Sequence, residues 1–158
     1  MTKLIQKYGP LSTVLTLALL IVGCAATTTS SQPSSQQGIK VTLTGDKEVP
    51  AVKTTGSGTG TFVIPADKSI SGSVTTTGVD GTAAHIHDSV RGETMCGAKN
   101  GPVIVPLTKG PDNTWSAAAG AKLTDAQYAS YLAGNLYVNV HTAANKGGEV
   151  CSPLTPVK

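Results

Sequence analysis

Leu136-Tyr137-Val138-Asn139-Val140-His141-Thr142 has the alternation of a β-strand. Successive side chains of a strand point to opposite faces, so Val138 and Val140 share one face while Tyr137, Asn139 and His141 share the other. The stretch therefore predicts a strand with an aliphatic face for a core and a polar face that presents a histidine.

Short alternating segments of the same kind recur on both sides of this stretch, separated by turn residues. Aromatic residues make up 4% of the chain, and there are 18 glycines. This composition and spacing are typical of an all-β domain, and we expect an antiparallel β-sandwich with Greek-key-like connections. The strands are predicted near 39–44, 58–64, 69–77, 83–88, 102–107, 113–118, 135–142 and 148–154.

One segment, from Leu123 to Leu132, has a helical pattern. Thr124 and Asp125 suit the start of a helix, and Gly134 suits its end. The residues predicted on its apolar side are Leu123, Tyr128, Tyr131 and Leu132. We expect one short helix that covers one end of the β structure.

The N-terminus has the pattern of an export signal. Lys3 and Lys7 precede an uncharged stretch whose apolar part is too short to span a bilayer. The stretch ends in Ile21-Val22-Gly23-Cys24, which resembles the lipobox of bacterial lipoproteins. We predict that residues 1–23 are removed as a signal peptide and that Cys24 is lipidated. An ordinary secretory signal with an unmodified cysteine is the alternative.

Residues 24–38 lack charged, aromatic and large aliphatic side chains, and they predict a flexible Ser/Thr/Gln tether. The tether leaves residues 39–158 as one domain, held at a membrane by the lipid. Ala25, a non-acidic residue after the cysteine, resembles the sorting signal that directs lipoproteins to the outer membrane. We therefore expect a location in the cell envelope, at the periplasmic or surface face of the outer membrane.

The charge balance excludes one class of partner. The net charge of +3 falls to +1 when Lys3 and Lys7 are removed. A nearly neutral domain with scattered lysines has no basic stripe, so we expect no nucleic-acid partner. There is no Gly-x-Ser-x-Gly motif of a hydrolase either, and a binding protein is favoured over an enzyme.

Cys96 and Cys151 remain once Cys24 is lipidated. An even pair in an oxidising compartment predicts a disulfide. The alternative is that one or both cysteines are soft metal ligands.

The three histidines of the chain lie in two predicted strands. His85 and His87 share a strand face because they are two residues apart, and His141 lies on the polar face described above. If the two strands are neighbours, three imidazoles converge, which suits copper or zinc with one position left open. Met95 could add a thioether ligand, and simple packing is the alternative for every one of these side chains.

Five segments in order resemble the signatures of the CHRD (chordin) domain family. They are LTGDKEVPAV (43–52), AAHIH (83–87), NGPVIV (100–105), LAGNLYVNVHT (132–142) and NKGGEV (145–150). The resemblance covers about residues 39–155. It implies a β-sandwich of exported proteins that serves extracellular interaction, with a protein partner or self-association.

A second resemblance concerns the histidines. A His-x-His strand followed by a distant strand histidine looks like the copper site of copper/zinc superoxide dismutase, which would make His85, His87 and His141 copper ligands. That family uses a fourth histidine and a zinc cluster, and this chain has no further histidine. Three hypotheses remain: a copper or zinc domain for sequestration or delivery, a metal-free interaction module, and a dismutase-like redox enzyme.

Overall fold

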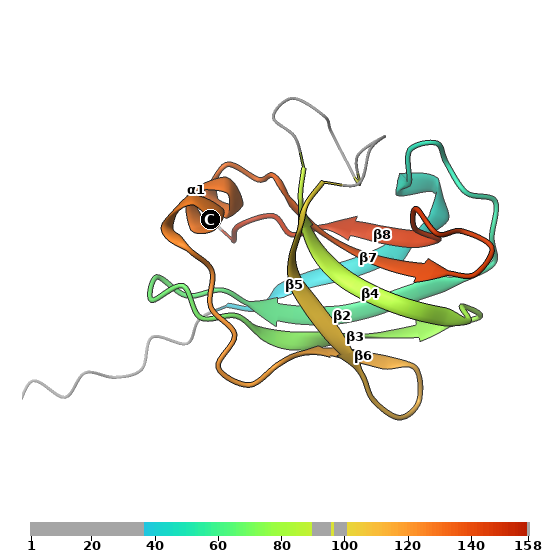
Figure 1. The fold of residues 1–158 in the computed structure, drawn as a ribbon, viewed down its shortest axis with the longest axis horizontal. Coiled ribbons are helices and arrows are strands. Elements are labelled where there is room, and N and C mark those ends of the chain that lie inside the picture. Colours follow the sequence, from blue (N-terminus) through green and yellow to red (C-terminus); the bar gives the residue numbers. More distant parts are fainter. Residues whose placement is uncertain (1–36, 90–95, 97–100, 158) are drawn as a thin grey trace, which may run out of the picture. The chain divides into compact units, whose positions relative to one another are not determined.

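The computed structural model describes residues 37–89, 96 and 101–157. The predicted signal peptide, the tether with Cys24, and Met95 lie outside the described residues. Figure 1 shows the arrangement of the elements. The strands are β1 (Ile39–Thr44), β2 (Ser57–Val63), β3 (Ser71–Thr77), β4 (Gly81–Asp88), β5 (Val103–Lys109), β6 (Thr114–Ala117), β7 (Leu136–Thr142) and β8 (Val150–Pro153), with a 3-10 turn η1 (Gly45–Lys47) and a helix α1 (Asp125–Leu132).

The eight strands form a closed barrel in the order β1-β2-β3-β6-β5-β4-β7-β8, and all of their pairings are antiparallel. The expected all-β antiparallel class is confirmed, but the predicted sandwich is corrected to a barrel. β1 also pairs with β8, through Thr44 and Cys151, and this contact closes the ring. Alternating strands fit a sandwich and a barrel equally well, so this closing contact could not be predicted from alternation.

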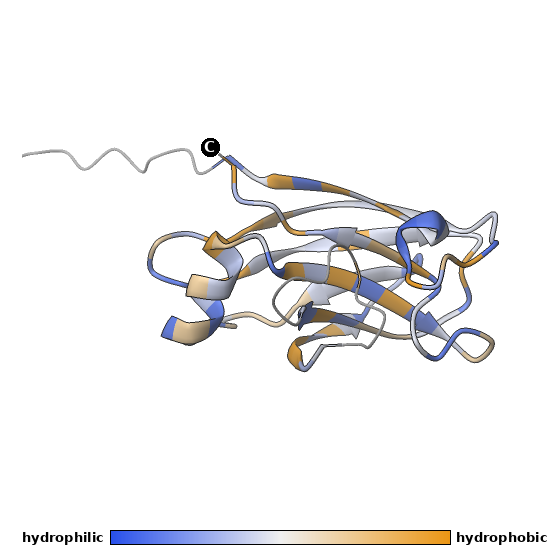
Figure 2. Cartoon of the chain, turned by 90° about the horizontal axis from the view of Figure 1, so that it is seen from above, coloured by the Kyte–Doolittle hydropathy of each residue, from blue (hydrophilic) through white to orange (hydrophobic). Residues whose placement is uncertain are grey.

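The inner faces of the strands form one aliphatic core. Figure 2 shows hydrophobic residues recurring between polar ones along the strands. On the two central strands Ile86 lies opposite Val138 and Ala84 opposite Val140, and all four are buried. The faces of β4 and β7 that bear the histidines therefore point away from this core, as alternation predicts.

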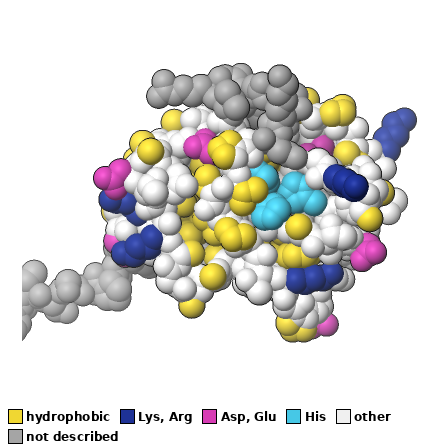
Figure 3. Space-filling model, viewed as in Figure 1, with side chains coloured by type: hydrophobic (Ala, Val, Ile, Leu, Met, Phe, Trp, Pro, Cys, Tyr) yellow, Lys and Arg dark blue, Asp and Glu magenta, His cyan; other side chains and the backbone are white. Residues whose placement is uncertain are grey.

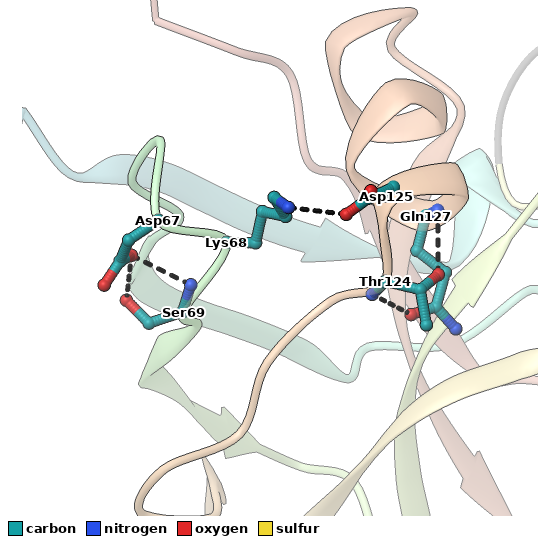
Figure 4. A network of polar contacts seen from close by, with 6 residues as sticks. All are labelled: Asp67, Lys68, Ser69, Thr124, Asp125 and Gln127. Atoms are coloured by element: carbon teal, nitrogen blue, oxygen red, sulfur yellow. Dashed lines mark hydrogen bonds and ion pairs between the residues drawn. The ribbon is translucent and has the colours of Figure 1, made fainter.

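Helix α1 lies at one end of the barrel (Figure 1) and begins where expected. Thr124 is the N-cap, and its side chain and that of Gln127 form a capping box; Lys68 also pairs with Asp125 (Figure 4). Tyr131 is buried, but Leu132 is 57% exposed, so its predicted place on the apolar side is wrong. Leu132 is the last residue of the helix, where the chain turns toward Gly134 at φ +78°. Among the described residues, no helix is long and apolar enough to cross a membrane.

Candidate metal centre

The pairing of β4 with β7 brings the three histidines together. His141 lies opposite Ala83, two residues along from the pair of His85 with Asn139, and His87 lies opposite Tyr137. Their side chains share the outer face, and Figure 3 shows the three imidazoles as one group on the surface. One ligand nitrogen from each ring lies within 4.8 Å of the other two. The predicted convergence of His85, His87 and His141 is confirmed.

Two contacts hold the ring of His87. Its Nδ1 lies 2.8 Å from the carbonyl oxygen of Gly101, and its ring stacks on Tyr137 with centroids 5.1 Å apart. The Gly101 backbone lies so close to β4 that a Cβ there would meet the Asp88 oxygen at 1.6 Å. Only glycine permits this approach, which aims the Gly101 carbonyl at His87.

His141 is held in the same way by the turn between β7 and β8. Its Nδ1 lies 3.0 Å from the carbonyl oxygen of Lys146. This turn is Asn145-Lys146-Gly147-Gly148, and the backbone N–H groups of Thr142 and Gly148 both donate to the Asn145 carbonyl. A backbone carbonyl accepts only, so Nδ1 of both His87 and His141 must carry a hydrogen.

The Nε2 atoms of His87 and His141 consequently both present lone pairs in the neutral rings, yet they lie 3.3 Å apart. Two lone pairs at this distance repel unless a cation lies between or beside them. Zinc–nitrogen bonds of 2.0–2.1 Å in a tetrahedral arrangement separate two ligand nitrogens by about 3.3 Å. The spacing of the two Nε2 atoms therefore fits a shared metal ion.

The electrostatics favour neutral imidazoles. Burial lowers the pKa of His85 and of His87 below their ordinary value. Burial, followed by the proximity of His85 and His87, lowers the pKa of His141 to about 4. A metal ion competes with protons for imidazole nitrogens, so these low pKa values keep the lone pairs available near neutral pH.

His85 completes the group from the open side. It is half-buried, and its Nδ1 is buried without a hydrogen-bond partner. The three rings line a hollow of about 400 Å³ that also includes Thr82, Val103 and Lys146. The described residues offer no fourth histidine, cysteine or carboxylate to this group. A bound ion would thus retain a position that faces the hollow.

The two remaining cysteines do not join the histidines. Cys96 and Cys151 lie at disulfide-bonding distance from each other, with Cα atoms 6.2 Å apart and a sequence separation of 55. Cys151 of β8 lies opposite Asn139 of β7, so the pair holds Cys96 against β8. This arrangement agrees with the predicted disulfide and disfavours the alternative of cysteine ligands.

Sequence reasoning missed the groups that orient the imidazoles. They are backbone carbonyls of Gly101 and Lys146, and no side-chain pattern indicates a carbonyl partner. The two nearby acids serve elsewhere: Asp88 accepts from Ser130, and Glu149 accepts from Thr54, Thr142 and Asn145. The one available signal in the sequence was the Gly101-Pro102 dipeptide, which indicates a turn with an unusual backbone requirement at Gly101.

No curated protein and no solved structure matches the chain significantly. The model of the CHRD domain matches residues 39–152, which include all eight strands up to Ser152 and all three histidines. The chain belongs to the CHRD domain family.

Proposed function

We propose that this CHRD domain binds one copper or zinc ion through His85, His87 and His141, and sequesters or delivers it in the cell envelope. The observation that carries the proposal is the 3.3 Å contact between Nε2 of His87 and Nε2 of His141, whose Nδ1 atoms both lie against carbonyl oxygens. Neutral imidazoles are common ligands of both metals. Copper remains our first expectation and zinc the second.

The geometry suits binding and release more than chemistry. Three neutral ligands add no negative charge to offset the ion, and the hollow leaves the fourth position accessible. An incoming donor from a small ligand or a protein partner could take that position, which is how an exchangeable ion is passed between proteins. Lys146 and Val103 lie on the wall of the same hollow, so a partner would meet one cation and one exposed aliphatic side chain.

The test is metal content and affinity of the purified protein, measured by calorimetry and elemental analysis with Cu(I), Cu(II) and Zn²⁺. We expect close to one ion per chain. The variant with His85, His87 and His141 all changed to Ala should lose this binding. Lys146→Ala is the matched control, because it removes a side chain from the hollow but keeps the carbonyl that accepts from His141. Absence of copper and zinc binding in the unmodified protein would refute the proposal.

That negative outcome would favour a metal-free interaction module, with the histidines as packing groups. The redox alternative of dismutase type rests on the resemblance of His85, His87 and His141 to the copper ligands of that family, and the accessible fourth position is compatible with it. Copper-loaded protein that turns over superoxide no faster than free copper would remove it.

We further propose that the domain is tethered to a membrane through lipidated Cys24, after removal of residues 1–23, by the 24–38 segment. The support is the sequence Ile21-Val22-Gly23-Cys24 behind an apolar stretch. Mass spectrometry of the mature N-terminus should find a diacylglyceryl group on Cys24. Cys24→Ala should release the protein from the membrane fraction. A mature N-terminus other than Cys24 would contradict the tether.

A further inference from the structure

A second polar cluster lies beside the histidines, on the side of β7 that faces β8. Glu48, which directly follows η1, is 6% exposed, and Asn139 of β7 is 0% exposed. Oε1 of Glu48 and Oδ1 of Asn139 are both buried without a hydrogen-bond partner. Such orphaned acceptors are costly in a protein interior, so the pair requires a donor between the two oxygens or a cation.

The two side chains face each other. Nδ2 of Asn139 donates to Oε2 of Glu48 at 3.5 Å, which leaves Oε1 and Oδ1 as the other corners of the pair. Both orphaned oxygens also border Gly148: a Cβ there would lie 2.4 Å from Oδ1 of Asn139 and 2.6 Å from Oε1 of Glu48. Gly148, at φ +134°, thus leaves the space in which the pair forms.

We propose that Glu48 is protonated and forms a carboxyl–carboxamide pair with Asn139, and that this pair is the positioning element for His141. The carboxyl O–H donates to Oδ1 of Asn139 while Nδ2 of Asn139 donates to Oε2, so one proton satisfies both orphaned oxygens. Removal from water supports the protonated form, because it raises the pKa of Glu48 to about 7.

A bound cation explains the cluster less well. A hard cation such as Ca²⁺ takes six to eight oxygens. Among the described residues the buried side-chain oxygens without a partner are Oε1 of Glu48, Oδ1 of Asn139 and Oγ1 of Thr44, which are too few. The titratable groups on the elements around Glu48 are Asp46 and Lys47 of η1, Glu149 before β8, and the histidines of β4 and β7, whose imidazoles are neutral near neutral pH. Asp46 is exposed, and the Glu149 carboxylate already accepts three hydrogen bonds. None of these groups forms an ion pair with Glu48 among the described residues.

The link from this pair to His141 is short. Nδ2 of Asn139 also donates to the carbonyl oxygen of Gly147 at 3.2 Å. Gly147 follows Lys146, whose carbonyl fixes Nδ1 of His141. The pair therefore anchors the turn that sets the tautomer of His141 and directs its Nε2 toward His87. The consequence for metal affinity rests on the proposed function, whereas the pair and the tautomer do not.

The experiment is ¹⁵N NMR of the imidazoles in the metal-free protein across pH, with three variants. Glu48→Gln keeps a neutral donor and acceptor, Glu48→Ala removes the pair, and Asp46→Asn is the matched control that neutralises an exposed acid in the same turn. Unmodified protein should hold His141 with hydrogen on Nδ1 up to about pH 7 and lose this preference above it. Glu48→Gln should retain the tautomer at every pH above the pKa of His141, which is about 4, and Asp46→Asn should behave as the unmodified protein does.

Glu48→Ala should give a mixture of tautomers at every pH, and should lower zinc affinity by about 10-fold or more while Glu48→Gln preserves it. The same pH dependence in Glu48→Gln as in the unmodified protein would overturn the proposal, and so would an unchanged tautomer in a folded Glu48→Ala. Infrared spectra at about pH 6 should show a protonated carboxyl group that Glu48→Gln removes. The NMR and infrared measurements test the proposal even if the protein binds no metal, whereas the zinc affinity does not.

Discussion

On one face of β7, Val138 and Val140 are buried among aliphatic side chains, whereas on the other face Asn139 and His141 are buried among polar groups. The side chains of Val138 and Val140 have no donors or acceptors to satisfy. The outer face contains Asn139 Oδ1, which has no partner, and beside it His85 Nδ1 and Glu48 Oε1, which also have none. The side chains on the two faces of β7 are therefore similarly buried, but one face is aliphatic and the other is polar.

Because their chemistry differs, the two faces of β7 should respond differently to amino-acid substitution. An aliphatic face contributes through area and volume, so a substitution there acts on stability. A buried polar face contributes through matched partners, and its unmatched atoms mark places where a proton or a ligand belongs. Substitutions on the outer face should therefore change binding and pH dependence as well as stability.

Loss of the Cys96–Cys151 link should have the largest effect on stability. The link closes a loop across 55 residues, for which the chain-entropy estimate is about 4 kcal/mol. The double variant Cys96→Ala and Cys151→Ala should lose about this much unfolding free energy in denaturant titrations. A loss below about 1 kcal/mol would show that the outer face is held without the link.

The second-largest expected effect is a dependence of the unfolding free energy on pH, which comes from the buried groups Glu48 and His141. Glu48 has a folded pKa of about 7 against an ordinary 4.5, so its stabilising effect is full below 4.5 and is lost as pH rises through 7. His141 has a folded pKa of about 4 against 6.5, so its effect is full above 6.5 and is lost as pH falls through 4. Each effect is at most about 3 kcal/mol, and the two slopes oppose each other.

The variant Glu48→Gln separates the pH effect of Glu48 from that of His141. Its unfolding free energy should gain on that of the unmodified protein by up to about 3 kcal/mol between about pH 5 and about pH 8, because the amide does not ionise. Asp46→Asn should show no such gain. Denaturant unfolding at the two pH values measures this difference, and parallel curves for Glu48→Gln and the unmodified protein would contradict the raised pKa.

On the inner face, Val138→Ala should cost about 2 kcal/mol through the lost methyl groups and the small cavity that remains. Val103→Ala is the matched control, since Val103 is 50% exposed and the same truncation should change stability little. The folded Val138→Ala protein should retain its metal affinity. A fall in affinity comparable to that of a histidine variant would show that the two faces are coupled.

Alternation in the sequence was sufficient to predict the strands and the shared face of the three histidines, because both depend on the two-residue period of a strand. It could not predict that β1 meets β8, since that contact involves one residue pair at the strand ends. Nor could it predict what covers the outer face. Glu48 reads as part of a turn near Pro50, and its burial against Asn139 depends on how η1 packs on β8.

The mildest test of the outer face is Tyr137→Phe. The hydroxyl of Tyr137 accepts a hydrogen bond from the backbone N–H of Gly101 at 3.1 Å, and the ring stacks on His87. Phe preserves the stacking but leaves the buried Gly101 N–H unsatisfied, which costs about 1 kcal/mol. The carbonyl of Gly101 accepts a hydrogen bond from His87. A less firmly held Gly101 should therefore also weaken metal binding a few-fold, as loss of a histidine ligand would weaken it more strongly. Calorimetric unfolding and zinc titration of this one variant measure both effects. A stability loss with unchanged affinity would mean that the carbonyl of Gly101 is fixed mainly by its contact with the end of β4, and that the tyrosine hydroxyl contributes to stability alone.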